Sequence, residues 1–479
     1  MTLQTTDNKR DSFTTIRRLF RNLEQENSAA ANLVRLCAFL YKEDMPEELF
    51  KQGVRNLGGI FEPLSSPSVL DNALERACRF GFLRYEPSKE FFVTNSRLQD
   101  FLKQDMSDSE RTYAGLTVRA VNHVFPDEFK SEADLDQKTR LMSSAFSCVT
   151  LIEQWDFGFE EAAQFLDKMG RYQYEMGEEA YAEPLFERAL GIREKLLGKD
   201  NLYVADSLTH LARAYQSQSK YEQAKPLYER ALAIREKALG KQHAKVAENL
   251  SDLASWYHGR GSYAEAKPFY EQALQTFEQV QGSWHPDVVN SLSNLACLYC
   301  DMKAYEKAKP LYEIALQIVE QVNGKQNPEI VPALNHLAKL EEAQGRYAHA
   351  LPFYNRALEI LENSFGKRSP KLFNGINNIA HIYEQLGVYD YAESLYQHAL
   401  FLLENAYGKS CTYRTDSLNH LAVLYEKQGQ YEQALQWYEK ALDFLKFEQE
   451  TPEFSMCSEN YAALLSKMKG NVERCVVEN

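Results

Sequence analysis

A repeat of 42 residues is the feature that most constrains the fold of this chain. The segment "YEQAKPLYERAL" begins at Tyr221, and related segments begin 42 residues apart at Tyr263, Tyr305, Tyr347, Tyr389 and Tyr431. An earlier copy, "EAYAEPLFERAL", begins at Glu179 in the same phase. Seven copies without an insertion or deletion indicate that each copy forms the same structural unit.

A second pattern lies between these segments with the same step. It reads "SLTHLARAY" at Ser207, "SLSNLACLY" at Ser291 and "SLNHLAVLY" at Ser417. In both patterns apolar residues recur at i, i+3, i+4 and i+7, which is the spacing of one helical face. Each repeat is therefore predicted to be two helices, and such pairs bury their apolar faces by stacking into a solenoid with a concave surface.

Turn residues support this division. Gly261, Gly345, Gly387 and Gly429 precede second helices, where a tight turn favours a left-handed residue. The segments "HPD", "NPE" and "SPK" place proline at the first turn of first helices. The proline of "KPLY" falls inside the second helix, so we expect a local distortion there.

The motif L-A-x-x-Y followed by A-x-P-L-Y-x-x-A-L resembles tetratricopeptide repeats of the kinesin-light-chain type. The resemblance implies an all-α fold, a right-handed α-solenoid. It also implies a non-catalytic scaffold whose first helices line a concave surface that binds proteins or peptides.

The first 160 residues show no repeat. "SVLDNALERACRFGFLRYEPSKEFFVTN" predicts a helix followed by a two-stranded wing around Glu86 to Glu90, the order of a winged helix. This region resembles the winged helix and helical linker that follow the nucleotide-binding module in NB-ARC-type STAND NTPases with C-terminal tetratricopeptide repeats. Asn95 stands where that family carries a nucleotide-contacting histidine, which argues against nucleotide sensing by this domain.

These patterns predict four segments. They are a winged-helix-like domain (1–105), a helical linker (106–160), seven repeat units (161–457) and a C-terminal capping helix with a tail (458–479).

One short motif suggests a nucleotide site. Gly408-Lys409-Ser410 matches the end of a phosphate-binding P-loop. A P-loop also needs a glycine five residues earlier, but that position is Leu403, inside a predicted helix. Gly408 is in phase with Gly198 and Gly240 and is predicted to end a helix between repeats. No complete G-x-x-x-x-G-K-[ST] motif occurs, so we expect no enzymatic activity and no cofactor.

The cysteines and histidines give no metal motif. Cys297 and Cys300 form a CxxC within a predicted helix, without a second pair at zinc-finger spacing, so packing or groove lining is favoured and no metal is expected. His210, His336 and His420 share one repeat position and are predicted to make polar contacts between helices. The eight scattered cysteines and the absence of an apolar leader favour a cytoplasmic protein that does not enter a membrane.

The concave surface supplies the candidate site. One predicted column of first-helix positions contains Thr209, Ser251, Ser293, Asn335, Asn377 and Asn419, and a second contains Arg213, Ser255, Cys297, Lys339, His381 and Val423. Asn290 and Asn374 lie one turn away. Asparagine amides can donate to and accept from an extended peptide backbone. We therefore expect a ligand to contact Asn290, Asn335, Asn374, Asn377, Asn419, Arg213, Lys339 and His381.

Two functions remain open at this stage. The first is a peptide-binding scaffold or sensor of a STAND-type signalling system, whose expected partner is a nucleotide-binding protein or upstream module. The second is a DNA-binding regulator that uses the winged helix, with the repeats as its effector sensor. The net charge is −14, and residues 1–100 contain 14 Lys and Arg against 14 Asp and Glu. Because DNA-reading domains carry an excess of positive charge, this balance makes nucleic-acid binding the weaker hypothesis.

Overall fold

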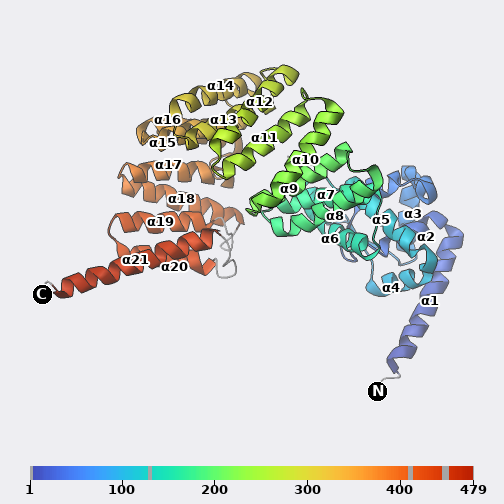
Figure 1. The fold of residues 1–479 in the computed structure, drawn as a ribbon. Helices are drawn as coiled ribbons and strands as arrows, with labels where there is room; N and C mark the ends of the chain where they lie inside the picture. Colours follow the sequence, from blue (N-terminus) through green and yellow to red (C-terminus); the bar gives the residue numbers. More distant parts are fainter. Residues whose placement is uncertain (1–3, 128–131, 408–413, 445–451, 478–479) are drawn as a thin grey trace. The chain divides into compact units, whose positions relative to one another are not determined.

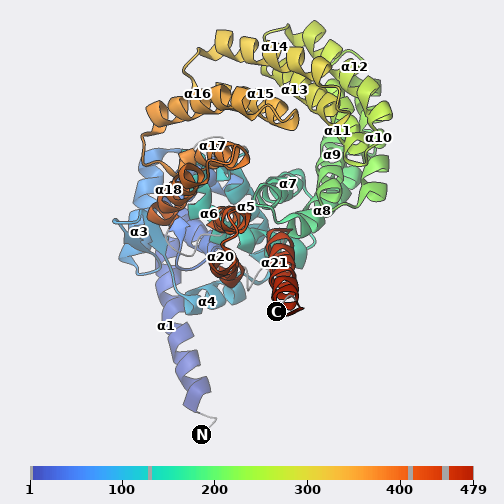
Figure 2. The same ribbon diagram turned by 90° about the vertical axis from the view of Figure 1, so that its left-hand side faces the viewer.

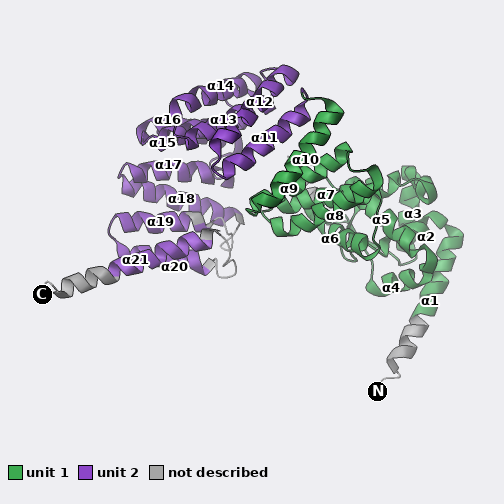
Figure 3. Cartoon of the chain, viewed as in Figure 1, with its two compact units in different colours: residues 1–241 green, residues 242–479 purple. Residues whose placement is uncertain are grey.

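Two compact units, residues 1–241 and 242–479, make up the chain (Figure 3). The computed structural model describes residues 4–127, 132–407, 414–444 and 452–477. The unit boundary falls within the repeats rather than near residue 160. One reason is that a single apolar core runs from Phe20 to Ile192 and joins the N-terminal region to the first helix pair.

The N-terminal part of the first unit is helical with one small sheet (Figure 1). A three-stranded antiparallel sheet has the order β1-β3-β2, with Met45 and Tyr85 both paired with Phe92. The elements are α1 (Gln4–Glu26), α2 (Ser28–Cys37), β1 (Met45–Pro46), η1 (Leu49–Gly53), η2 (Val54–Asn56), η3 (Gly59–Ser65), α3 (Pro67–Arg79), β2 (Arg84–Glu86), β3 (Phe91–Val93) and α4 (Ser96–Met106). This order of helices and a two-stranded hairpin is the one expected for a winged helix.

Three further elements lead into the repeats. They are η4 (Ser107–Ser109), α5 (Glu110–Val124) and α6 (Glu132–Gln154). Helix α5 is largely buried and packs against both α2 and α7, which connects the N-terminal region to the first repeat.

Antiparallel helix pairs form the remainder of both units. The first unit contains α7 (Glu160–Glu175), α8 (Glu179–Leu197), α9 (Leu202–Ser217) and α10 (Tyr221–Leu239). The second contains α11 (Ala244–Gly259), α12 (Tyr263–Gln281), α13 (Pro286–Asp301), α14 (Tyr305–Asn323), η5 (Pro328–Ile330), α15 (Val331–Ala343), α16 (Tyr347–Phe365), η6 (Pro370–Leu372), α17 (Phe373–Gln385), α18 (Tyr389–Tyr407), α19 (Arg414–Lys427), α20 (Tyr431–Phe444) and α21 (Pro452–Val477). Within the second unit each pair packs on the next, as Figure 2 shows for α13 to α16. The predicted α-solenoid is therefore confirmed.

Glycines end the second helices as the repeat predicts. Five of them take φ between +81° and +89° with ψ between +153° and +161°, a region that is almost restricted to glycine and costs other residues about 1–3 kcal/mol. They are Gly198, Gly240, Gly282, Gly324 and Gly366, which follow α8, α10, α12, α14 and α16. Gly408, in the same phase, lies outside the described residues together with Lys409 and Ser410.

The internal prolines do not interrupt the second helices. Pro226, for example, lies inside α10, which is continuous from Tyr221 to Leu239. The expected distortion is therefore not a break. Pro226 is in the second turn, so it removes a single backbone bond, while tertiary packing holds the rest of the helix.

Candidate functional site

The predicted groove positions differ widely in exposure. Asn290, Asn374 and Lys339 are exposed, while Asn335, Asn377 and His381 are partly buried. Arg213 is also partly buried, but it lies in the first unit, apart from the other candidates.

Two positions of the first column are not on an open surface. Thr209 and Asn419 are each only 4% exposed. The Thr209 hydroxyl donates to Ala205 O within its own helix at 3.0 Å, and Asn419 accepts from Asn460 of α21 at 3.4 Å. Asn419, one of the expected ligand contacts, is therefore covered by α21, which the repeat pattern cannot show.

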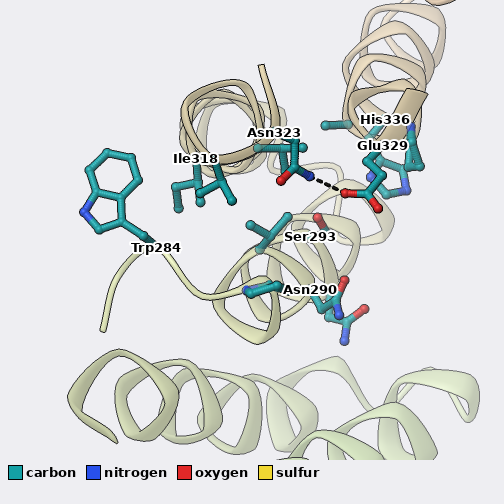
Figure 4. A pocket seen from close by; sticks show the side chains of 14 residues that line it. Trp284, Asn290, Ser293, Ile318, Asn323, Glu329 and His336 are labelled. Carbon is teal, nitrogen blue, oxygen red and sulfur yellow. Dashed lines mark hydrogen bonds between the residues drawn. The ribbon is translucent and has the colours of Figure 1, made fainter. Parts of the chain in front are cut away.

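A cavity of about 570 Å³ lies beside the groove positions (Figure 4). It lies between α13, α14, η5 and α15, all in the second unit. Its lining residues are Trp284, Pro286, Val289, Asn290, Ser293, Asn294, Ile318, Val319, Val322, Asn323, Glu329, Pro332, Ala333 and His336. We call this the α13–α15 pocket. It combines an apolar floor with a few amide, carboxylate and imidazole groups, as ligand sites in proteins commonly do.

The spacing of α13 explains how the polar groups reach the pocket. Pro286, Val289, Asn290, Ser293 and Asn294 are separated by three, four, seven and eight residues, so they share one helical face. Two apolar residues and two exposed amides of this face therefore line the same pocket. The sequence-predicted Asn290 and Ser293 therefore do lie at one site.

The opposite wall carries the charged and titratable groups. Asn323 Nδ2 donates to the Glu329 carboxylate, which closes one side of the pocket (Figure 4). The His336 ring stacks on Tyr312, with centroids 5.1 Å apart. Burial and the nearby Lys339 lower the pKa of His336, so this imidazole is neutral near pH 7. Its Nδ1 is buried and has no hydrogen-bond partner among the described residues, which leaves a polar atom for a ligand.

Sequence reasoning missed the apolar part of the pocket. Trp284 and Val322 are 52% and 54% exposed, although both are large apolar side chains. Trp284 lies in the loop before α13, and Val322 lies near the end of α14. The predicted groove contains only first-helix positions, whereas the end of a second helix and the "QGSWHP" loop supply the apolar lining of the pocket. An exposed tryptophan beside a repeat boundary was the available signal.

The repeated histidines share an aromatic contact that the sequence did not predict. His210, His336 and His420 each face an aromatic ring 24 residues earlier, namely Phe186, Tyr312 and Tyr396. His210 Nδ1 also lies 2.9 Å from Asp167 Oδ1. Burial alone would raise the pKa of Asp167, but His210 and Arg193 hold it at about 2.

A second recurring contact links the two helices of a repeat. A buried tyrosine in the second helix donates its hydroxyl to a side chain twelve residues earlier, near the end of the first helix. Tyr354 donates to Glu342 at 2.6 Å, and Tyr396 donates to Glu384 at 2.9 Å. These bonds explain why buried tyrosines recur without an exposed function.

Among the described residues, two groups of side chains could hold a metal ion. His381, Glu384 and His420 form one, but Glu384 already accepts from Tyr396 and lies 2.6 Å from Lys427 Nζ. His258, Cys297 and Asp301 form the other. No sequence motif marks either group, because their members come from neighbouring repeats.

The local structure explains two sequence features that bear on nucleotide binding. Leu403, where a P-loop would need glycine, is 3% exposed inside α18, which excludes a phosphate loop at this position. Asn95 caps α4 by accepting from Leu98 N at 2.8 Å, so its side chain is engaged in helix capping. No helix in the described part of the chain has both the length and the apolar character needed to cross a bilayer.

The chain was compared with curated proteins and with solved structures. A comparison with curated proteins returns no match. Among solved structures, a putative kinesin light chain from Podosopora anserina matches at 23% identity, covering 44% of this chain and 99% of its own, with a TM-score of 0.38. A Rap protein complexed with competence and sporulation factor matches at 14% identity, covering 78% of this chain and 92% of its own, with a TM-score of 0.41.

One solved structure extends the likeness beyond the repeats. A STAND protein with a tetratricopeptide repeat sensor from Pyrococcus horikoshii matches over 94% of this chain, at 16% identity and a TM-score of 0.52. The match spans 61% of that protein's chain, and it shows a shared fold.

The family assignment rests on the repeats themselves. The tetratricopeptide repeat model matches residues 161–237, 215–279, 287–363 and 372–446, which together are more than half of the chain. These matches cover the helix pairs that supply the α13–α15 pocket. The chain therefore belongs to the tetratricopeptide repeat family, and its fold is that of a ligand-binding scaffold.

Proposed function

We propose that the protein binds an extended peptide segment in the α13–α15 pocket, and that an apolar side chain of the peptide occupies its floor. The observation that carries this proposal is the joint exposure of Trp284 and Val322 on a cavity of about 570 Å³. Large apolar side chains left exposed around a hollow are typical of recognition surfaces.

The polar groups of the pocket suit a peptide backbone. Asn290 and Asn294 each present an exposed amide that can donate and accept, and His336 adds a buried ring nitrogen. Glu329 is the one charged side chain in the lining, and it is already engaged by Asn323. The pocket therefore favours a neutral, apolar segment rather than a strongly acidic one.

Peptide selection tests this proposal. A random peptide library would be selected on the immobilised wild-type chain alone, and the enriched peptides would then be measured on wild type and on the Val322→Glu variant. Because Val322 is exposed, the new charge alters the pocket without disturbing the core. We expect enrichment of peptides that share an apolar anchor residue. Peptides that bind wild type and Val322→Glu equally would reject the pocket as the site.

We propose further that the chain acts as the sensor part of a STAND-type signalling system. Its support is the fold shared with a STAND protein over 94% of this chain. The tagged chain would be incubated in extract of the source cells with and without a selected peptide. We expect to recover an ATP-hydrolysing partner in only one of the two conditions. Recovery of the same partner with and without peptide, or recovery of no such partner, would reject the signalling role.

A further inference from the structure

Three different metal-ligating side chains meet on two neighbouring first helices of the second unit. His258 lies near the end of α11, and Cys297 and Asp301 lie one turn apart on α13. His258 Nε2 is 2.6 Å from Asp301 Oδ2, and the imidazole, thiol and carboxylate donor atoms all lie within 4.8 Å of one another.

Surrounding side chains orient the imidazole. The edge of the His258 ring meets Tyr263 at 5.6 Å and Tyr270 at 6.2 Å between centroids, and its side chain is 16% exposed. Cys297 and Asp301 are exposed. The two tyrosines therefore cover the histidine, while the thiol and the carboxylate are open to solvent, so an ion can reach the cluster.

The repeat provides an internal comparison. One of the later seams, between α17 and α19, places Glu384, Val423 and Lys427 at the positions of His258, Cys297 and Asp301. There Glu384 and Lys427 form an ion pair at 2.6 Å, and Val423 offers no donor atom. At the α17–α19 seam the polar pair forms without a third donor, so the third donor at the α11–α13 seam is not needed for a contact of this kind.

We propose that His258, Cys297 and Asp301 bind a divalent zinc-type cation, with water in the fourth position. Zinc is bound by thiolate, imidazole and carboxylate groups in tetrahedral sites with bonds of about 2.0–2.3 Å. Ligand atoms in such a site are roughly 3.3–3.7 Å apart. When an ion binds, the distance between His258 Nε2 and Asp301 Oδ2 must therefore lengthen, and the Cys297 sulfur must move closer to both.

These adjustments need only side-chain rotation. Cys297 and Asp301 are exposed and free to change rotamer, while the helices stay in place. The Cys297 thiol releases its proton to solvent on binding, and the thiolate and carboxylate then neutralise the two positive charges of the ion. The His381, Glu384 and His420 group lacks this balance, because Lys427 already neutralises its carboxylate.

Cobalt(II) titration of the full chain tests the proposal. Cobalt(II) reports tetrahedral geometry by visible absorption and thiolate ligation by a near-ultraviolet charge-transfer band, and zinc is expected to displace it. We expect the charge-transfer band to vanish in Cys297→Ser, and cobalt affinity to fall at least tenfold in His258→Gln and Asp301→Asn.

Two matched variants separate this site from others. Cys300→Ser removes the neighbouring thiol, and His420→Gln removes a histidine of the second group. Both are expected to retain the band and to bind cobalt within twofold of wild type. Absence of a thiolate band in wild type, or its loss in Cys300→Ser but not in Cys297→Ser, would overturn the proposal. Far-ultraviolet circular dichroism would verify the fold of each variant.

Discussion

Gly170 provides a quantitative test of how tightly the first helix pair is packed. A Cβ atom added at this glycine of α7 would lie 2.6, 2.8 and 2.9 Å from three ring atoms of Phe186 in α8. Ordinary carbon contacts are about 3.5–4.0 Å, so the ring would have to retreat by roughly 1 Å. Phe186 is only 1% exposed and also contacts the His210 ring, so its movement would disturb neighbouring side chains.

The magnitude follows from two opposing effects. Overpacking of a core costs about 1–3 kcal/mol, and the fully buried ring places this case near the upper end. Replacing glycine by alanine within a helix regains up to about 1 kcal/mol. Gly170→Ala should therefore lower the free energy of unfolding by about 1–2 kcal/mol.

Gly191 is the matched control. It lies in α8 of the same helix pair, and an added Cβ there meets nothing within 4 Å. Gly191→Ala should therefore stabilise the chain by up to about 1 kcal/mol. Urea unfolding followed by circular dichroism measures both variants in the same transition. If Gly170→Ala proved as stable as Gly191→Ala, the close contact with Phe186 and the reasoning from it would be wrong.

Four further outcomes are expected. Asp167 has a pKa of about 2 in the folded chain, below its ordinary value near 4. The stability that it contributes is therefore complete above about pH 5 and is lost as the pH falls toward 2. Asp167→Asn should lower the free energy of unfolding by about 2–3 kcal/mol at pH 7, and unfolding measurements should show a weaker dependence on acid pH. Tyr396→Phe, which removes a hydroxyl donor to a buried carboxylate, should cost about 1.5–3 kcal/mol, whereas the exposed Tyr391→Phe on the same helix should change stability by less than about 0.5 kcal/mol. Lys303 has φ +58° at a turn where five of the other repeats have glycine, so Lys303→Gly should stabilise the chain by up to about 1 kcal/mol. A loss of stability would contradict the strain. In a gel-shift assay at low salt, the full chain should not retard duplex DNA, because the acidic side chains of Asp71 and Glu75 lie beside Arg79 on the exposed face of α3 and repel phosphate. A salt-dependent shift would support the DNA-binding hypothesis.

The repeat period made most of the architecture predictable from sequence. The step from Tyr221 to Tyr431 defines the paired helices, and the glycines at the same step mark where second helices end. The wing was predictable from the pattern around Glu86 to Glu90, and the structure places a hairpin there. Periodicity records which face of a helix is apolar, so it predicts helix pairs well.

The candidate site was only partly predictable. Asn290 was expected at the surface and does line the α13–α15 pocket, whereas Asn419 was expected there and is covered by α21. The register assigns both to the same surface, because it contains no information about what packs over a given repeat. The pocket also depends on Trp284 and Val322, which lie outside the first helices. Similarly, His258 and Cys297 are 39 residues apart in the sequence, and only the stacking of neighbouring repeats brings their side chains together.

Binding of a selected peptide to two matched valine variants tests the proposed function most directly. Val322 lines the α13–α15 pocket, and Val280 is its equivalent one repeat earlier, also exposed but outside the pocket. Fluorescence anisotropy would measure the affinity of a labelled peptide for wild type, Val322→Glu and Val280→Glu. A peptide side chain that loses its apolar contact forfeits about 1.5–3 kcal/mol, so Val322→Glu should weaken binding at least tenfold while Val280→Glu stays within twofold. Equal affinities for the two variants would contradict peptide recognition by the α13–α15 pocket.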